Sequence, residues 1–143
     1  MRLFGQKIAL VVCATSLVSL GACGGDDSSG DGGTAPLQAT VTAPDEIEPW
    51  AVSPSALNMN EGDTGVFDCP SNGTLQTVWG DSTYTGDSSI CTAAVYEGVI
   101  TVEDGGLVSF DVSKGQAEYG SGSANGVTTE SYGEWNLSFT LNK

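Results

Sequence analysis

Hydrophobic and polar residues alternate in short runs along the second half of the chain. In the clearest run, the apolar residues Trp135, Leu137, Phe139 and Leu141 are separated by single asparagine, serine and threonine residues. A period of two is typical of a strand with one buried face. Runs of the same kind predict further strands over residues 64–69, 76–79, 100–102 and 108–112. The Asp-Gly-Gly sequence at 104–106 predicts a tight hairpin.

One segment departs from this alternation. Residues 87–98 begin with the capping sequence Asp-Ser-Ser and end with Gly98, and Ile90, Ala93 and Ala94 lie between them at helical spacing. We therefore expect a helix whose alanines lie close against a sheet. The expected fold class is α+β, mostly strands around a single helix, in one domain that spans residues 55–143.

The first 22 residues have the features of an export signal. Arg2 and Lys7 place two positive charges near the start of the chain, and an apolar run over residues 8–20 follows. This run is shorter than the roughly 20 residues that a membrane-spanning helix needs. The ending Leu-Gly-Ala-Cys at 20–23 resembles a bacterial lipobox, so we expect acylation of Cys23, with palmitate among the acyl groups. The alternative is an ordinary secretory signal with an incidental cysteine.

Residues 23–54 are expected to form a tether between this anchor and the domain. Gly24 stands where an aspartate would mark retention at the inner membrane, which favours the outer membrane of a bacterial cell envelope. Residues 24–34 are glycine, aspartate, serine and threonine, and residues 35–54 contain four of the five prolines. Such sequences are typical of flexible or extended linkers. Trp50 is the residue in this stretch that could dock on the domain.

The composition excludes several classes of function. The chain has 18 acidic and four basic side chains and no histidine, for a formal charge of −14; without Arg2 and Lys7 the charge is 2 − 18 = −16. Phosphate backbones are bound by clustered lysine and arginine, so we expect no nucleic-acid partner. The absence of histidine removes histidine-dependent catalytic pairs and imidazole metal ligands. We expect no cofactor and no metal, and we expect the acyl chains, not a basic patch, to hold the protein to the membrane.

Four cysteines fit an exported domain. Cys13 lies within the signal and Cys23 is assigned to the lipid, which leaves Cys69 and Cys91. An even pair in an oxidising compartment predicts a disulfide between them. The alternative is a reactive thiol, but no histidine or nearby lysine is present to lower its pKa.

A long series of residues resembles the LCCL domain family. The most specific part runs from Val78-Trp79-Gly80 through Cys91-Thr92-Ala93-Ala94. Further matches, in order, are Cys69-Pro70, 98–100, 105–106, 114–115, 119–121, 125–127, 131–133, Trp135 and 138–139. The resemblance implies antiparallel strands around a single central helix and a binding module without catalytic activity. Members occur in coagulation factor C, cochlin and other secreted proteins.

The sequence departs from the family at positions that bear on ligand binding. Tyr96-Glu97 stands where members often have histidine, and Ser123-Ala124 stands where basic residues are frequent. Animal members also carry a second disulfide that this chain cannot form. Lipopolysaccharide binding, proposed for animal members, is therefore not an expectation for a chain whose only lysines after the signal are Lys114 and Lys143.

Aromatic residues are the best candidates for a binding site. Five of them, Trp79, Tyr84, Tyr119, Tyr132 and Trp135, could stack on sugar rings, and Asn125 could supply hydrogen bonds. The alternative is that most of these aromatic residues belong to the core or cover the helix. Tyr96 is added because it departs most from the family. The candidate ligand-binding residues are Trp79, Tyr84, Tyr96, Asn125 and Tyr132.

The expected function is that of a membrane-anchored exported lipoprotein with a non-catalytic module that binds a glycan or another envelope component. The alternative is a structural or assembly lipoprotein that packs on a protein partner. Paired carboxylates could support glycoside hydrolysis without histidine, but no spacing in the chain selects a pair.

Overall fold

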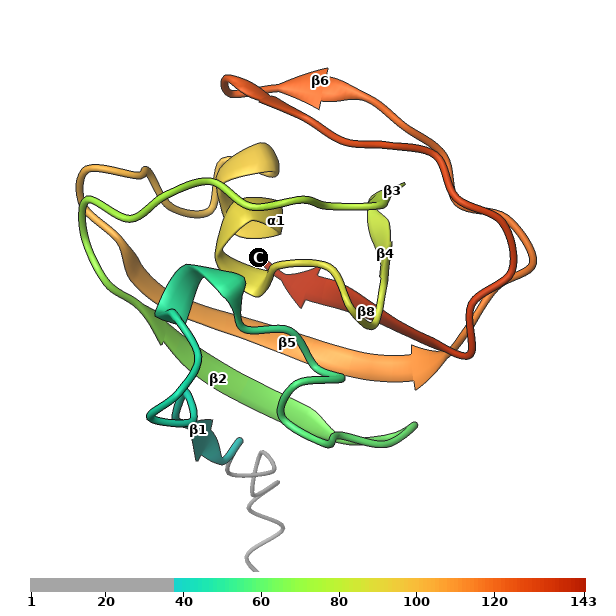
Figure 1. Cartoon of the computed structure of the whole chain (residues 1–143), viewed down its shortest axis with the longest axis horizontal. Helices are drawn as coiled ribbons and strands as arrows, with labels where there is room; N and C mark the ends of the chain where they lie inside the picture. Colours follow the sequence, from blue (N-terminus) through green and yellow to red (C-terminus); the bar gives the residue numbers. More distant parts are fainter. Residues whose placement is uncertain (1–37) are drawn as a thin grey trace, which may run out of the picture. The chain divides into compact units, whose positions relative to one another are not determined.

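A computed structural model describes residues 38–143 of the 143-residue chain. Its main element is a six-stranded sheet with the order β1-β2-β5-β8-β4-β3 (Figure 1). The strands are β1 (Thr40–Val41), β2 (Thr64–Cys69), β3 (Gly80–Asp81), β4 (Thr83–Thr85), β5 (Gly106–Lys114) and β8 (Leu137–Asn142). All neighbours pair antiparallel except β1 and β2, which are parallel. The sheet is therefore mixed, and the expectation of antiparallel strands alone is wrong for β1.

The long strand β5 is the centre of the packing. Its register pairs Phe67 of β2 with Val108, and Phe139 of β8 with Val112. All four side chains are buried, as is Phe110, whose ring contacts that of Phe139 edge to face at 6.1 Å between centroids. The alternation is thus confirmed in β5, where Val108, Phe110 and Val112 are buried and the residues between them are not. In β8 the polar Ser138 is buried beside Phe139, and Leu137 and Leu141 are half-buried.

The one α-helix in the described part of the chain is α1 (Ile90–Tyr96), and all seven of its residues are buried. The Ser89 side chain caps it by accepting a hydrogen bond from the Thr92 amide at 3.0 Å. Gly98 follows with φ of 72°, a left-handed conformation that suits a residue just beyond a helix. The helix is shorter than the predicted 87–98, since its first residues form the cap and the last form the C-terminal turn.

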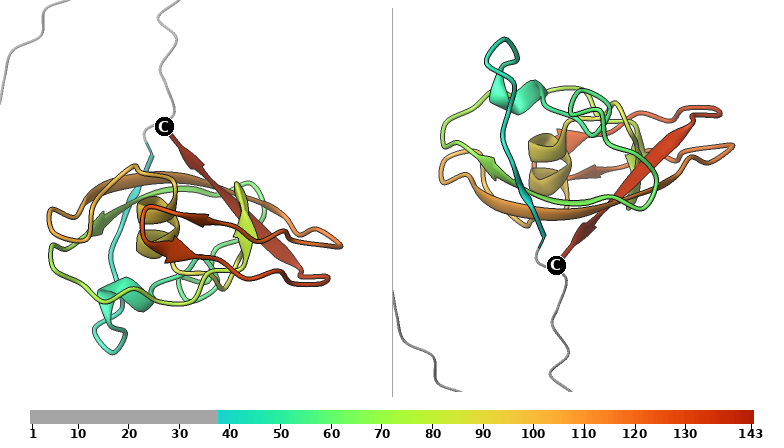
Figure 2. Two further views of the ribbon diagram at one scale, coloured as in Figure 1. Left: turned by 90° about the horizontal axis from the view of Figure 1, so that it is seen from above. Right: turned by 90° about the horizontal axis from the view of Figure 1, so that it is seen from below.

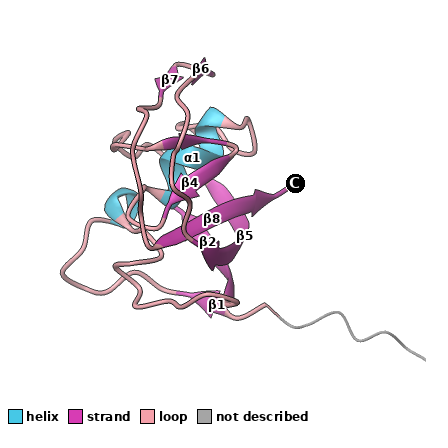
Figure 3. Ribbon diagram, turned by 90° about the vertical axis from the view of Figure 1, so that its right-hand side faces the viewer, coloured by secondary structure: helices cyan, strands magenta, loops and turns pink. Residues whose placement is uncertain are grey.

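The helix α1 lies between two layers of the domain. The sheet lies on one side, and the segment between β5 and β8, which includes β6 (Ser123–Ala124) and β7 (Val127–Thr128), lies on the other (Figures 1 and 2). Figure 3 shows the β6–β7 hairpin at the opposite end of the domain from β1. The fold class is α+β, as predicted. None of the helices within residues 38–143 is long and apolar enough to cross a membrane.

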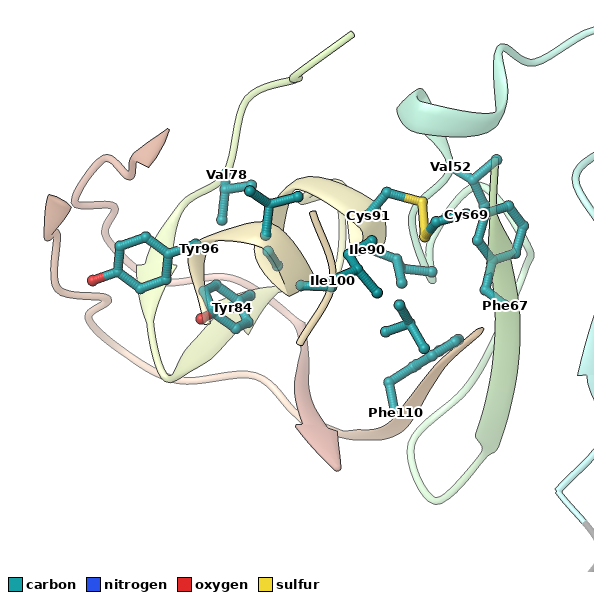
Figure 4. Packing of buried hydrophobic residues seen from close by; sticks show 14 of the residues in the cluster. Val52, Phe67, Cys69, Val78, Tyr84, Ile90, Cys91, Tyr96, Ile100 and Phe110 are labelled. Carbon is teal, nitrogen blue, oxygen red and sulfur yellow. A yellow bond between two sulfur atoms is a disulfide. The ribbon is translucent and has the colours of Figure 1, made fainter. Parts of the chain in front are cut away.

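The disulfide between Cys69 and Cys91 is present and joins the end of β2 to the first turn of α1. The two Cα atoms are 5.7 Å apart, and both residues are buried. Figure 4 shows this disulfide at one end of the packed cluster and the rings of Tyr84 and Tyr96 at the other. The predicted pairing is confirmed, and it ties the helix to the sheet at one end of the core.

Part of the predicted tether belongs to the folded domain. Residues 49–51 form a short 3₁₀ helix (Pro49–Ala51), and the Trp50 side chain is completely buried. Its indole N–H donates to the Pro70 carbonyl at 2.9 Å. Val52 is also buried, and its carbonyl accepts from the Ile90 amide at 3.0 Å. The boundary expected at residue 55 is therefore wrong, because apolar side chains before it complete the core; residues 1–37 lie outside the described part.

Two segments that the sequence predicted to be strands, residues 76–79 and 100–102, do not form strands in the structure. The Gly105 amide donates to the Thr101 carbonyl at 3.0 Å, so 100–102 leads into a tight turn and does not run as a strand. Residues 76–79 contribute one bridge, between Trp79 and Glu130, immediately before β3. Trp135 lies before β8, outside the strand that the alternation predicted for it.

Candidate ligand-binding face

Three of the aromatic residues named from the sequence come together at the surface. The rings of Trp79 and Tyr132 have centroids 6.0 Å apart at an interplanar angle of 64°. Those of Tyr132 and Trp135 are 5.7 Å apart at 82°. Tyr132 is 43% exposed, and the two tryptophans are half-buried. We call Trp79, Tyr132 and Trp135 the aromatic face.

Backbone pairing holds the segments that carry these rings. Trp79 and Glu130 form a parallel bridge, in which the Gly80 amide donates to the Glu130 carbonyl at 3.0 Å and the Glu130 amide donates to the Val78 carbonyl at 2.9 Å. The Trp79 amide donates to the Ser88 hydroxyl at 2.9 Å, which ties Trp79 to the residues just before α1. The face is thus attached to the domain through main-chain bonds that do not depend on the ring side chains.

Hydrogen bonds of the Tyr119 segment hold two of the three residues of the aromatic face in place. Tyr119 exchanges two main-chain hydrogen bonds with Tyr132, at 2.8 and 3.1 Å, and its own side chain is buried. Its hydroxyl contacts the Ser138 hydroxyl at 2.6 Å and accepts from the Gln116 amide at 2.9 Å. The Trp135 amide in turn donates to the Gln116 carbonyl at 3.1 Å. Tyr119 therefore positions Tyr132 and Trp135 and is itself inaccessible to a ligand.

Tyr84 and Tyr96 belong to the core and not to the face. Tyr84 is fully buried, and its hydroxyl donates to Glu97 Oε1 at 2.7 Å. Burial first, and then this hydrogen bond to a carboxylate, raise the pKa of Tyr84 far above its ordinary value. Tyr96 is also buried, and its hydroxyl donates to Asp81 Oδ1 at 3.0 Å. Burial and the Asp81 carboxylate likewise raise the pKa of Tyr96.

Asn125 lies in the turn between β6 and β7, where it serves the fold. Its φ is 49°, and Gly126 follows at 79°, as a two-residue hairpin turn requires. Its side-chain amide donates to the Tyr96 carbonyl at 2.9 Å and so satisfies one of the free acceptors at the end of α1. Asn125 also lines a hollow of about 390 Å³ together with Val95, Ile100 and Glu103. The structure therefore does not bring Asn125, Tyr84 or Tyr96 to the aromatic face.

The charges around the face are negative. Glu130, the bridge partner of Trp79, is exposed, as is Glu134, which lies between Tyr132 and Trp135 in the sequence. The lysines of the described part are Lys114 and Lys143, and Lys143 forms an ion pair with Glu97 at 3.0 Å. No group of three or more potential metal ligands gathers in this part of the chain. The pairing of Glu130 with Trp79, 51 positions apart, has no signal in the local sequence.

The structure is that of a small disulfide-bonded α+β domain with a partly exposed aromatic face, and comparison identifies its family. The LCCL domain family model matches residues 46–139, so the chain belongs to the LCCL domain family, a family of non-enzymatic binding modules. The match begins before residue 55, in agreement with the burial of Trp50.

Curated relatives with a similar segment include cochlins of several mammals. The guinea pig (Cavia porcellus) and human (Homo sapiens) cochlins are each 39% identical over 77 residues, and mouse (Mus musculus) cochlin is 38% identical over the same length. The matched segment covers 52% of this chain and 14% of each cochlin. The similarity thus concerns one domain of a longer protein.

Proposed function

We propose that this chain is an exported lipoprotein of a bacterial cell envelope, anchored in the outer membrane through acyl groups on Cys23, and that its LCCL domain binds a glycan of the envelope at the aromatic face. The observation that carries the binding part is the contact of Trp79, Tyr132 and Trp135 at the surface. The anchoring part rests on the lipobox-like sequence at 20–23.

An aromatic face of this kind suits a sugar. One side of a pyranose ring presents C–H groups, which gain by leaving water for an apolar surface. Aromatic rings carry negative charge on their faces and so attract the weakly positive C–H hydrogens. Adjacent rings in edge-to-face contact, with centroids about 6 Å apart, offer more than one such surface to a chain of linked sugars.

Binding is tested with the full-length protein, purified in detergent, and insoluble polysaccharide prepared from the envelope. Tyr132→Ala is expected to reduce the fraction bound about tenfold, since loss of a central aromatic contact commonly costs more than about 1 kcal/mol. Tyr132→Phe retains the ring and is expected to bind as the parent does. Leu107→Ala is the matched control, because Leu107 is 66% exposed on β5, three strands away from β3 in the sheet.

Failure of the protein to bind any envelope polysaccharide would refute glycan binding. Capture of a single envelope protein by cross-linking, with the same loss in Tyr132→Ala, would instead support the assembly lipoprotein, in which the face packs on a protein partner.

The anchor is tested separately. Cells that express the parent are labelled with a palmitate analogue, and the protein is followed through membrane fractionation. Cys23→Ser is expected to abolish the label and to release the protein from the membrane fraction. Equal labelling and equal membrane retention of the variant would contradict the lipid anchor while leaving the binding proposal intact.

A further inference from the structure

Acidic side chains predominate next to the aromatic face. Glu130 pairs with Trp79 in the bridge, and Tyr132, two residues further on, also forms a bridge. Residues two apart on an extended strand project to the same side. The Glu130 carboxylate is therefore expected beside the rings of Trp79 and Tyr132, whose contact the structure records. Glu134 is exposed two residues after Tyr132, and Glu118 is exposed next to Tyr119, whose backbone pairs with that of Tyr132.

Within residues 38–143 no ion pair neutralises these carboxylates. Lys143 is engaged by Glu97, and Lys114, which pairs with Leu137 close to Trp135, forms no ion pair with Glu118, Glu130 or Glu134. The three carboxylates therefore outnumber the one lysine near the face. A ligand with phosphate or uronate groups would be repelled from such a surface. A protonated amine would gain in two ways, since carboxylates attract it and the faces of tryptophan and tyrosine rings bind cations.

The geometry favours a polysaccharide over a cationic peptide strand. Beside Trp79 the sheet edge is already occupied, because the Gly80 amide and the Glu130 amide are both used in the pairing of these segments. An extended peptide therefore finds no free main-chain edge to extend there. None of the three rings lines the hollow at β1 and β2 or the hollow at the end of α1. The rings stand at 64° and 82° to one another at the surface, so they present faces in different directions to the successive sugars of a chain.

We infer that the aromatic face binds a glycan that carries free amino groups, such as a polymer of N-unsubstituted hexosamine, with Trp79, Tyr132 and Trp135 stacking on the sugars and Glu130 and Glu134 pairing with the ammonium groups. This inference rests on the proposed glycan binding and adds the charge of the ligand to it.

The test compares two oligosaccharides with the same backbone and different charge. The full-length protein is titrated by calorimetry at about pH 5.5, where glutamates are mostly ionised, with a glucosamine hexamer and with its fully N-acetylated form. We expect the amine form to bind about tenfold more tightly at low salt, since each exposed ion pair contributes only modestly and two of them act together. Raising the salt to about 1 M, where the Debye length is about 3 Å, should remove most of this difference.

Two double variants test the contribution of the carboxylates, and Tyr132→Ala tests the contribution of the rings. Glu130→Gln with Glu134→Gln should lose most of the preference for the amine form and keep the affinity for the acetylated form. Glu61→Gln with Glu103→Gln removes the same charge from exposed sites on other segments and should keep the preference within about twofold. Tyr132→Ala should weaken the binding of both hexamers.

Each remaining outcome decides a different point. Equal binding of the two hexamers, with loss of both in Tyr132→Ala, would overturn the inference and leave the proposed function standing. Absence of binding to either hexamer, or to any envelope polysaccharide, would overturn both. Displacement of the amine form by a lysine-rich peptide at similar concentration would identify a cationic protein as the partner and would overturn the inference.

Discussion

Trp50 provides the sharpest test of the domain boundary. Its side chain is completely buried, and its indole N–H donates to the Pro70 carbonyl at 2.9 Å. Replacing a buried tryptophan with alanine costs about 3 to 5 kcal/mol, and the lost hydrogen bond contributes about 1 kcal/mol of it. The free energy of unfolding of a small domain is about 5 to 15 kcal/mol, so Trp50→Ala should remove a large part of the stability.

Gly73 makes the test more specific. A Cβ atom built on Gly73 would overlap the indole ring of Trp50. Gly73→Ala should therefore cost about 1 to 3 kcal/mol in the parent, where the ring must shift. In the Trp50→Ala background the same methyl group enters the space that the indole has left and should cost little. The double-mutant cycle is expected to give a coupling free energy of at least about 1 kcal/mol.

The assay is urea unfolding followed by far-ultraviolet circular dichroism, with Tyr132→Ala as the control. Tyr132 is 43% exposed, so its substitution should change the free energy of unfolding by less than about 1 kcal/mol. A cost below about 1 kcal/mol for Trp50→Ala, or additivity of Trp50→Ala and Gly73→Ala within about 0.5 kcal/mol, would refute the assignment of residues 49–52 to the core.

Three further predictions concern the disulfide, the buried tyrosines and the β6–β7 turn. The double substitution Cys69→Ala and Cys91→Ala should lower the free energy of unfolding by about 3 kcal/mol, because the cysteines are 22 residues apart and the cross-link no longer restricts the unfolded chain; an unchanged urea midpoint would contradict this. Above about pH 10 the unfolded chain loses its tyrosine protons first, since the folded-state pKa values of Tyr84 and Tyr96 are raised, so stability should fall with rising pH. Tyr84→Phe should make this fall shallower in a pH series of unfolding curves, and an identical slope in parent and variant would show that Tyr84 does not contribute. Asn125→Ala should cost about 1 to 2 kcal/mol, because it removes the hydrogen bond to the Tyr96 carbonyl and places alanine at φ of 49°; ligand affinity should stay within about twofold of the parent, and a larger loss would return Asn125 to the binding site.

Features encoded by neighbouring residues were predictable. The alternation over Val108–Val112 and Leu137–Leu141 corresponds to β5 and β8, and the capping sequence before Ile90 corresponds to the start of α1. In each case the period of the apolar residues matches the geometry of the element that buries them. Cysteine number and the expected compartment were sufficient for the disulfide, since only one pair remained.

Features that depend on distant residues were not predictable from the pattern. Residues 40–54 contain prolines and little periodicity, and nothing nearby in the sequence shows that the Trp50 indole packs over the backbone at Gly73. The parallel pairing of Thr40 with Val66 likewise depends on contacts between segments far apart in the chain. Local sequence reports which side chains need burial, but not which distant surface has room for them.

The aromatic residues show the same limit and also separate stability from binding. Composition does not distinguish Tyr96, the buried last residue of α1, which is hydrogen-bonded to Asp81, from Tyr132, which is 43% exposed and contacts the rings of Trp79 and Trp135. The main-chain bonds of Tyr132 to Tyr119 hold its backbone whatever side chain it carries. Tyr132→Ala should therefore reduce binding while the unfolding midpoint hardly changes, whereas Tyr96→Ala should lower the midpoint and leave the affinity of the folded fraction unchanged. The reverse pattern would show that the ligand site lies at the end of α1 and not at the aromatic face.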